Sequence, residues 1–190
     1  MATSFTLKHR IDAHEVNPEN ELSIHEMMIL FEDIAANHTK MYNCDRNYIA
    51  EHNGLIWVLT KIKLNIISVA NYYDEINIQT KAYAPQKIKF DRDFVIKKDN
   101  QILYQAMSEW CLLDINTRIP KRSSTIDFPL GDLDETRLMD DKYFNIHLSI
   151  DDMELVYEKT IRYSDLDINN HTNNVYYNDF ALDVFDSQFL

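Results

Sequence analysis

The sequence is poor in glycine, proline and cysteine, and these shortages exclude several classes of protein. Of its 190 residues only 2 are glycine, 4 are proline and 2 are cysteine. The two glycines, Gly54 and Gly131, cannot build a phosphate-binding loop, because such loops need several glycines at close spacing. Two cysteines without a CxxC pattern make no disulfide scaffold and fit a reducing compartment. We expect neither a nucleotide-binding loop nor a disulfide framework.

Basic charge and long apolar runs are also scarce. The chain has 19 Lys and Arg against 31 Asp and Glu, a net charge of −12 and a pI near 4.9. This charge opposes binding to nucleic acid or to an anionic membrane. The longest apolar stretches, such as 55–59 and 66–70, are too short to span a bilayer, and the N-terminus lacks the apolar run of a signal peptide. We expect no nucleic-acid partner, no membrane span and a cytoplasmic location.

One long amphipathic helix follows the first twenty residues. From Ser23 onward, apolar residues recur every three or four positions and form one stripe, made of Ile24, Met27, Met28, Phe31, Ile34 and Ala35. Ser23 with Glu26 three residues later is a capping box, the usual start of a helix. The pattern predicts a helix that begins at Ser23 and ends near Asn43.

Strand patterns surround this helix. Alternating apolar and polar residues, rich in β-branched and aromatic types, predict strands at Phe5–Ile11, Leu55–Val69, Glu75–Ala84, Lys87–Lys97 and Ile102–Asp114. Asp99 and Asn100 between the last two predict a hairpin turn. A long helix with several long antiparallel strands predicts an α+β fold, in which a sheet packs around or against the helix.

The remainder of the chain predicts a linker followed by a second, shorter unit. Residues 115–150 contain Pro120, Pro129 and a cluster of acidic residues, as linkers do. Alternation resumes at Val156–Arg162 and predicts a strand, which leads into a turn at Asp165–Asn174. A second helical stripe follows, formed by Tyr177, Ala181, Val184 and Phe185.

This second unit repeats the first at a distance of 150 residues. The shift aligns Ile11 with Ile161, and it aligns Ser23 with Asn173, which are both residue types that cap helices. Strand, turn and helix agree without a gap, which is the pattern of an internal repeat.

The turn of the second unit is the richest part of the sequence in chemically active side chains. The segment SDLDINNHTNNVYYN, residues 164–178, combines two Asp, several Asn and one His before a helix. Asn and Asp are common in turns that have no other role. Asp and His also bind divalent ions, but no second His or Cys lies at ligand spacing. A turn and a reactive site are thus the two interpretations, and we expect no metal and no organic cofactor.

Within this segment, DLDINNHTNNVYY resembles the D-x-N-x-H-x-x-N signature of the acyl-acyl-carrier-protein (acyl-ACP) thioesterases. Further resemblance lies in Trp57–Leu59 and in Ser108–Asp114, which is similar to the family's S-x-W-x-x-x-D pattern, followed by an R-x-P turn at Arg118–Pro120. The resemblance runs through nearly the whole chain. It implies a tandem hotdog fold, in which an antiparallel sheet wraps each long helix.

The resemblance also implies a domain plan. We expect an N-terminal hotdog domain at 1–128, a linker at 129–150 and the start of a truncated C-terminal hotdog domain at 151–190. The first repeat is expected to be non-catalytic, because Asn17, Glu19 and Glu21 occupy the positions of the D-x-N-x-H residues.

Carried over by position, the resemblance makes Asp167, Asn169 and His171 the catalytic residues. Thioester hydrolysis needs a positioned water, a base and donors for the oxyanion. Asn169 and His171 would polarise the carbonyl or hold the water, and Asp167 would orient Asn169. Asn174 would shape the turn or cap the helix, and backbone N–H groups near Asn174 and Val175 would serve as oxyanion donors.

Other residues have two interpretations each. Met27, Met28 and Phe31 are either ordinary core or also the wall of an acyl pocket, together with Trp57, since methionine adapts to a flexible chain. Cys44 and Cys111 are expected to be buried packing residues, because a nucleophilic cysteine needs a nearby His and a lowered pKa.

The implied activity is hydrolysis of fatty acyl-ACP, which releases the fatty acid and ends chain elongation. Alternatives are an acyl-CoA thioesterase and a non-catalytic module that binds acyl chains or carrier protein. The acidic carrier protein would dock on basic residues, with candidates at Lys87, Lys89, Arg92, Lys97, Lys98, Arg118, Lys121 and Arg122.

The resemblance further implies a catalytic carboxylate beyond the second helix, where this chain has no residues. Three explanations are open: the chain is a fragment, it is naturally short, or a second copy in a homodimer supplies the missing sheet. We expect weak or no hydrolysis from the chain as it stands.

Overall fold

The computed structural model describes residues 4–129, 136–144, 149, 151, 153–168 and 170–185. The chain divides into two compact units, Met1–Tyr143 and Phe144–Leu190. The predicted boundaries of hotdog and linker stay a prediction. Among the described residues, no helix is long and apolar enough to cross a membrane.

The first unit contains an antiparallel sheet in the order β1-β3-β4-β5-β2. Its strands are β1 (Ser4–Arg10), β2 (Leu55–Ile66), β3 (Glu75–Ala82), β4 (Phe90–Lys98) and β5 (Gln101–Asp114). A short strand, β6 (Pro120–Lys121), pairs with β5, and a 3-10 turn, η1 (Ser123–Thr125), follows. All five strands predicted for this part of the chain are confirmed.

Two turns explain why strands β4 and β5 begin or end at residues other than the predicted ones. Asp99 and Asn100 both have positive φ, 48° and 66°, as a tight hairpin between β4 and β5 requires. Lys87 also has a positive φ of 55°, and Gln86 pairs with Lys89 in an isolated bridge. This turn delays the start of β4 to Phe90.

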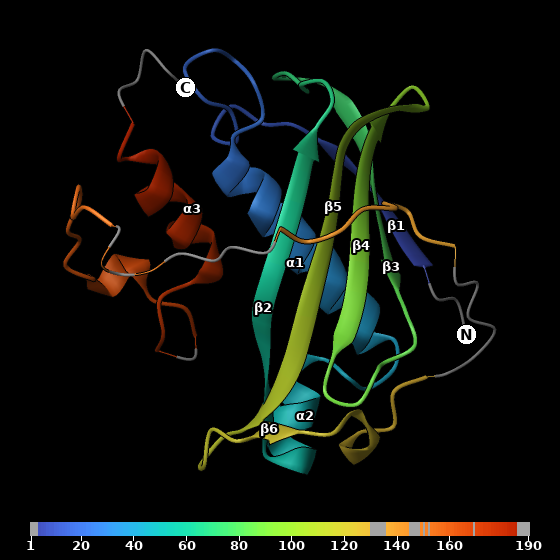
Figure 1. The fold of residues 1–190 in the computed structure, drawn as a ribbon. Coiled ribbons are helices and arrows are strands. Elements are labelled where there is room, and N and C mark those ends of the chain that lie inside the picture. The colour runs from blue at the N-terminus through green and yellow to red at the C-terminus, as the bar shows by residue number, and fades with distance from the viewer. Residues whose placement is uncertain are drawn as a thin grey trace. The chain divides into compact units, whose positions relative to one another are not determined.

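Helix α1 (Ile24–Lys40) lies against one face of the sheet (Figure 1). Ser23 is its N-cap, with Oγ accepting the N–H of Glu26 at 3.2 Å. The predicted stripe is the buried face, and Phe31 stacks on Phe94 of β4 with ring centroids 4.6 Å apart. The burial of this stripe removes apolar surface from water and so stabilises the packing of α1 on the sheet.

A second helix, α2 (Arg46–Asn53), closes one end of the sheet. Gly54 ends it in the left-handed conformation, with φ of 64°, which suits a residue without Cβ. Beneath it lies an apolar cluster of buried residues, namely Cys44, Ile49, Leu55, Ala82, Phe90, Leu112, Ile126 and Phe128, with Tyr42, Trp57 and Trp110 packed against it.

Residues 136–143 cross the face of the sheet that is opposite to α1 (Figure 1). Neighbouring residues of a strand point to opposite faces. On β4, Arg92 bonds to His38 of α1, whereas Asp93 bonds to Arg137 of the crossing segment. Part of the region that the sequence suggests as a linker therefore packs on the first unit.

The second unit contains a 3-10 turn, η3 (Tyr163–Asp165), and helix α3 (Asn174–Leu182). The strand predicted at Val156–Arg162 is wrong: no residue of this stretch is in a strand. A strand needs a hydrogen-bonded neighbour, and the described residues of this unit provide none. Val184 and Phe185 lie beyond the end of α3, so they do not extend its apolar face as predicted.

Candidate functional site

The loop between η3 and α3 holds the predicted site residues and is closed by backbone hydrogen bonds. The N–H of Asn173 donates to the carbonyl of Asp165 at 3.0 Å, and Leu166 forms a bridge with Thr172. Further in, the N–H of Asp167 donates to the carbonyl of His171 at 2.7 Å. The loop is thus a narrow hairpin that leads directly into the helix.

Asp167 shapes the tip of this loop with its side chain. Its Oδ1 accepts the N–H of His171 at 3.1 Å, and its carbonyl accepts the N–H of Asn170 at 3.0 Å. Asn170 has a φ of 60°, a conformation that asparagine tolerates better than most residues. The carboxylate therefore holds the backbone of His171 in place.

Of the two side chains predicted to bind the thioester, Asn169 and His171, the structure describes only that of His171. The side chain of His171 belongs to an exposed residue, as a group that meets an incoming substrate requires. Asn169 lies outside the described residues. Convergence of the carboxamide and the imidazole, and orientation of Asn169 by Asp167, stay predictions.

The start of α3 differs from the prediction in two respects. Asn173 is the N-cap, and its Oδ1 accepts the N–H of Val175 at 3.0 Å. That N–H is therefore already used in the cap, so Val175 is not a vacant oxyanion donor, and its side chain is buried. Asn174 is the first residue of the helix, so the capping role belongs to Asn173.

Asp165 is a buried carboxylate at the neck of the loop that sequence reasoning did not single out. It is 5% exposed, and its Oδ2 accepts the N–H of Arg162 at 2.7 Å. Lys159 Nζ lies 3.7 Å from Oδ1. The 150-residue repeat was the signal that could have found it, because the shift aligns Asp165 with another acid, Glu15.

The loop before α1 has the same hydrogen bonds. The N–H of Ser23 donates to the carbonyl of Glu15 at 2.9 Å, Val16 bridges Leu22, and the N–H of Asn17 donates to the carbonyl of Glu21 at 2.8 Å. Asn17 Oδ1 accepts the N–H of Glu21 at 2.9 Å, as Asp167 does for His171. The loop and the helix start of the repeat therefore recur in the structure, whereas its strand does not, and carboxylates stand where the second loop has amide and imidazole.

The predicted acyl-pocket residues lie in two places. Met27, Met28 and Phe31 are buried on α1. Trp57 is half-buried in the cluster beneath α2, where its indole N–H donates to the carbonyl of Cys44 at 2.9 Å and its ring meets Phe90 edge to face. A pocket that unites all four stays a prediction.

Both cysteines are buried free thiols. Burial raises the pKa of Cys44 to about 11, and burial also raises the pKa of Cys111. A thiol that stays protonated is a poor nucleophile. The structure agrees with the expected packing role.

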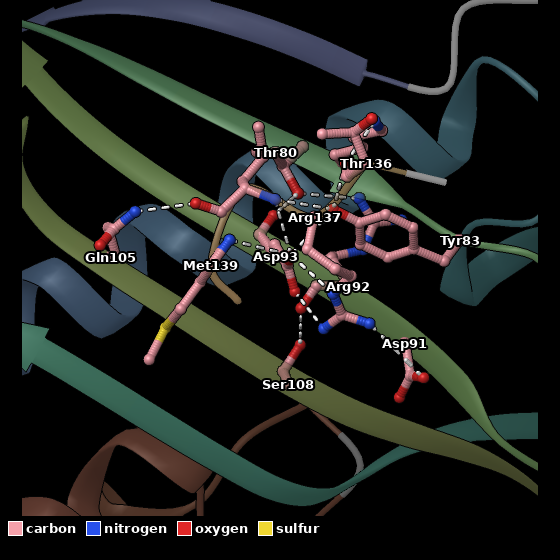
Figure 2. A network of polar contacts seen from close by, with 12 residues as sticks. Thr80, Tyr83, Asp91, Arg92, Asp93, Gln105, Ser108, Thr136, Arg137 and Met139 are labelled. Atoms are coloured by element: carbon pink, nitrogen blue, oxygen red, sulfur yellow. Dashed lines mark hydrogen bonds and ion pairs between the residues drawn. The ribbon is translucent and has the colours of Figure 1, made fainter. Parts of the chain in front are cut away.

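A polar network anchors residues 136–143 to the outer face of the sheet (Figure 2). Its centre is Asp93, which is fully buried and accepts bonds from Arg137 at 2.9 and 2.5 Å. Tyr83 Oη and the N–H groups of Leu138 and Met139 also donate to this carboxylate. The pKa of Tyr83 is raised by burial and by its bond to Asp93. The network is internally satisfied and has a structural role.

On the other face, Arg92 is buried, which corrects its predicted place among surface docking residues. Its Nη1 donates to His38 Nδ1 and to Thr80 Oγ1, both at 3.0 Å. Because arginine only donates, Nδ1 is the acceptor and the proton of His38 lies on Nε2, facing Tyr42 Oη. Burial lowers the pKa of Arg92 to about 10, so it remains a cation near neutral pH.

Two further features in the first unit resemble ligand sites. The ligand atoms of His14, Glu15 and Glu26 lie within 4.8 Å of one another. The Glu15 carboxylate is already bonded to His9 Nε2 and to the N–H of Asp12, which reduces its capacity to bind an ion. An open cavity of about 690 Å³ beside β1, β3 and the β4–β5 turn is lined mainly by polar and charged residues, and no predicted site residue is among them.

Family models match both units of the chain. The model of the acyl-ACP thioesterase N-terminal domain matches residues 2–125, and that of the C-terminal domain matches residues 149–190. Sheet, helix and loop define an α+β protein of the hotdog class. More narrowly, the chain belongs to the acyl-ACP thioesterase family.

Individual relatives agree with this assignment. The chloroplastic acyl-[acyl-carrier-protein] hydrolase FATB3 of Cuphea viscosissima is 26% identical over 97% of this chain and 49% of its own length. The chloroplastic palmitoyl-acyl carrier protein thioesterase of Arabidopsis thaliana is 26% identical over 91% of this chain and 45% of its own length. The chain spans about half the length of these relatives.

Solved structures confirm the predicted hotdog fold. An acyl-ACP thioesterase from Bacteroides thetaiotaomicron aligns with a TM-score of 0.85 and 22% identity, covering 98% of this chain and 75% of that one. The 12:0-ACP thioesterase from Umbellularia californica aligns with a TM-score of 0.77 and 19% identity, covering 99% and 77%. At these identities the likeness concerns the fold.

Proposed function

We propose that this chain belongs to an enzyme that hydrolyses the thioester of fatty acyl-ACP. Water adds to the thioester carbonyl, the carbon–sulfur bond breaks, and the products are a free fatty acid and the carrier protein's thiol. Release of the acyl chain ends its elongation. The names of the relatives support this activity, and the chain's own loop supports it with suitable chemistry.

The observation on which the proposal rests is the geometry of the loop from Asp165 to Asn173. It is closed at its neck by backbone bonds, and Asp167 holds the backbone of the exposed His171. A fixed backbone that presents an accessible imidazole suits a step that positions water and moves a proton.

In this mechanism, Asn169 and His171 hold the carbonyl and the attacking water, and Asp167 organises the loop that presents them. The amide of Asn169 and the ring of His171 are suitable donors to a developing oxyanion. The N–H of Val175 is engaged by Asn173, so side chains rather than that amide would supply the donation.

The acyl carrier protein is the proposed partner, and four basic residues remain as docking candidates. Among the described residues, Lys89, Lys98 and Lys121 form ion pairs with acids. Lys87, Arg118 and Arg122 are exposed, Lys97 is half-buried, and none of these four forms an ion pair within the described part of the chain. The N–H of Ser123 donates to the carbonyl of Lys87, which joins two of their loops. Acidic carrier protein would bind such a patch in a salt-sensitive manner.

Hydrolysis of a panel of acyl-ACP and acyl-CoA thioesters tests this proposal, with His171→Ala as the inactive control. The chain and a version extended at its C-terminus are measured side by side, and we expect the extended version to be faster. Faster turnover of acyl-CoA would favour the CoA rival. Retention of acyl-ACP without turnover in both versions would favour a binding module and contradict the proposal.

A further inference from the structure

The two ends of the site loop meet at one residue, Asp165. Its carboxylate accepts the N–H of Arg162, which enters the loop, and its carbonyl accepts the N–H of Asn173, which caps α3. Asp165 is 5% exposed, so its side chain does not itself meet a substrate. Removal of the Asp165 carboxylate would break its hydrogen bond to Arg162. The segment before the loop would then no longer be held to the residue that closes the loop.

The same arrangement occurs at Glu15 in the first unit, at each position 150 residues earlier. Glu15 Oε2 accepts the N–H of Asp12 at 2.6 Å, and the Glu15 carbonyl accepts the N–H of Ser23, the cap of α1. Glu15 is 4% exposed. A buried acid at the neck is therefore common to both loops.

The side chains paired with these carboxylates also correspond in position, although their chemistry differs. Lys159 Nζ lies 3.7 Å from the Asp165 carboxylate, and His9 Nε2 lies 2.8 Å from that of Glu15. Positions 159 and 9 are again 150 residues apart. Different acids paired with different bases keep one backbone geometry, which indicates that the loop requires the carboxylate itself.

We propose that Asp165 is the positioning residue of the site loop, acting through the loop backbone on His171 and on the start of α3. This inference rests on the proposed thioesterase function. The link is short: the bond from Asn173 to Asp165 is followed by the bridge of Leu166 with Thr172. Two bonds between Asp167 and His171 come next, one from the Asp167 N–H to the His171 carbonyl and one from the His171 N–H to the Asp167 carboxylate. A displacement of about 1 Å at a reacting group reduces a rate by up to about a hundredfold.

The first unit supplies a matched control. Asp165→Ala and Glu15→Ala remove the same contact from equivalent loops, and only the former loop contains the predicted catalytic residues. Both variants are made in the version extended at its C-terminus, where we expect Asp165→Ala to lower kcat on acyl-ACP about tenfold to a hundredfold with little change in KM. We expect Glu15→Ala to leave kcat within about twofold of the wild type, because the loop it loosens holds no catalytic residue.

Amide hydrogen exchange provides a readout that does not depend on turnover. Asp165→Ala should accelerate exchange at the N–H groups of Asp167 and Asn173, whereas Glu15→Ala should do so at Asn17 and Ser23. Equal losses of kcat in both variants would indicate general destabilisation and overturn the proposal. Unchanged kcat or unchanged exchange in Asp165→Ala would also overturn it.

Milder variants keep the test valid if the alanine variants fail to fold. Asp165→Asn and Glu15→Gln preserve shape and remove the charge, so we expect a loss of kcat of about threefold to tenfold in the former only. Wild-type kcat in Asp165→Asn would then overturn the positioning role. If the wild type, alone and extended, hydrolyses no acyl-ACP, the proposed function fails, while exchange at the loop amides still decides whether Asp165 closes the loop.

Discussion

The loop before α1 and the loop before α3 have the same backbone bonds and different side chains at their tips. Asn17, Glu19 and Glu21 stand where Asp167, Asn169 and His171 stand 150 residues later. The neck bonds, the isolated bridges and the positive φ of Asn20 and Asn170 correspond pair by pair. The backbone of the loop is therefore separable from its side chains: the backbone pattern recurs, and only the second loop has the residue types predicted to be catalytic.

The largest expected effect is on kcat, and it distinguishes the tip residues of the two loops. His171→Ala should lower kcat about 10²–10⁴-fold, because the imidazole would no longer position water or move a proton. Glu21→Ala, at the equivalent position of the first loop, should leave kcat unchanged. Steady-state hydrolysis of acyl-ACP measures both, and a similar loss in the two variants would contradict the distinction between the loops.

Removal of the N-cap side chain should destabilise α1 and α3 to a similar extent. Ser23→Ala removes the Oγ that accepts the N–H of Glu26, and Asn173→Ala removes the Oδ1 that accepts the N–H of Val175. Each change should destabilise its helix by about 1 kcal/mol. Urea unfolding followed by tryptophan fluorescence measures the first, since both Trp57 and Trp110 lie in the first unit, and exchange of the α3 amides measures the second. Costs that differ by several kcal/mol would break the equivalence.

The left-handed asparagines should show a still smaller, equal effect. Asn20→Gly and Asn170→Gly place a residue without Cβ at φ values of 70° and 60°. Glycine adopts this conformation without strain but is freer when unfolded. We expect each change to alter stability by less than about 1 kcal/mol, in the same direction, by the same two measurements. Opposite signs would show that the two tips differ in backbone as well as in side chains.

Acid should affect the first unit in a defined pH range. Bonds from the backbone and side chain of Thr117 and from Lys121 lower the pKa of Asp114 from 3.8 to about 2. A carboxyl group with a lowered folded-state pKa contributes stability above its unfolded pKa and loses it as pH falls through the folded value. The melting temperature by tryptophan fluorescence should therefore decline between about pH 4 and pH 2, and Asp114→Asn should flatten that decline.

Local sequence patterns predicted most elements of the first unit. The apolar stripe on α1, the Ser23 cap and the alternation of the five strands each follow from contacts within a few residues, so they are visible in the sequence. The failed strand prediction at Val156–Arg162 shows the limit of local patterns. Its alternation is compatible with a strand, but a strand forms only beside a partner, and the described part of the second unit has none.

The position of the candidate site was predictable from the sequence, but the contacts of its residues were not. The motif located the loop, because Asp, Asn and His at fixed spacing are legible in the sequence. The engagement of the Val175 N–H by Asn173 and the burial of Arg92 were not, because each depends on which side chain the folded chain brings within hydrogen-bonding distance.

By itself, the amino-acid sequence determined the α+β class and the helix that the sheet covers, because hydrophobic periodicity is a property of neighbouring residues. Its resemblance to the acyl-ACP thioesterases predicted the hotdog fold and the position of the candidate loop. Only the tertiary structure decided that Glu15 and Asp165 close equivalent loops, and that Asp93 holds residues 136–143 across the sheet. These carboxylates derive their roles from donors that folding brings to them, and burial away from water makes each such bond consequential.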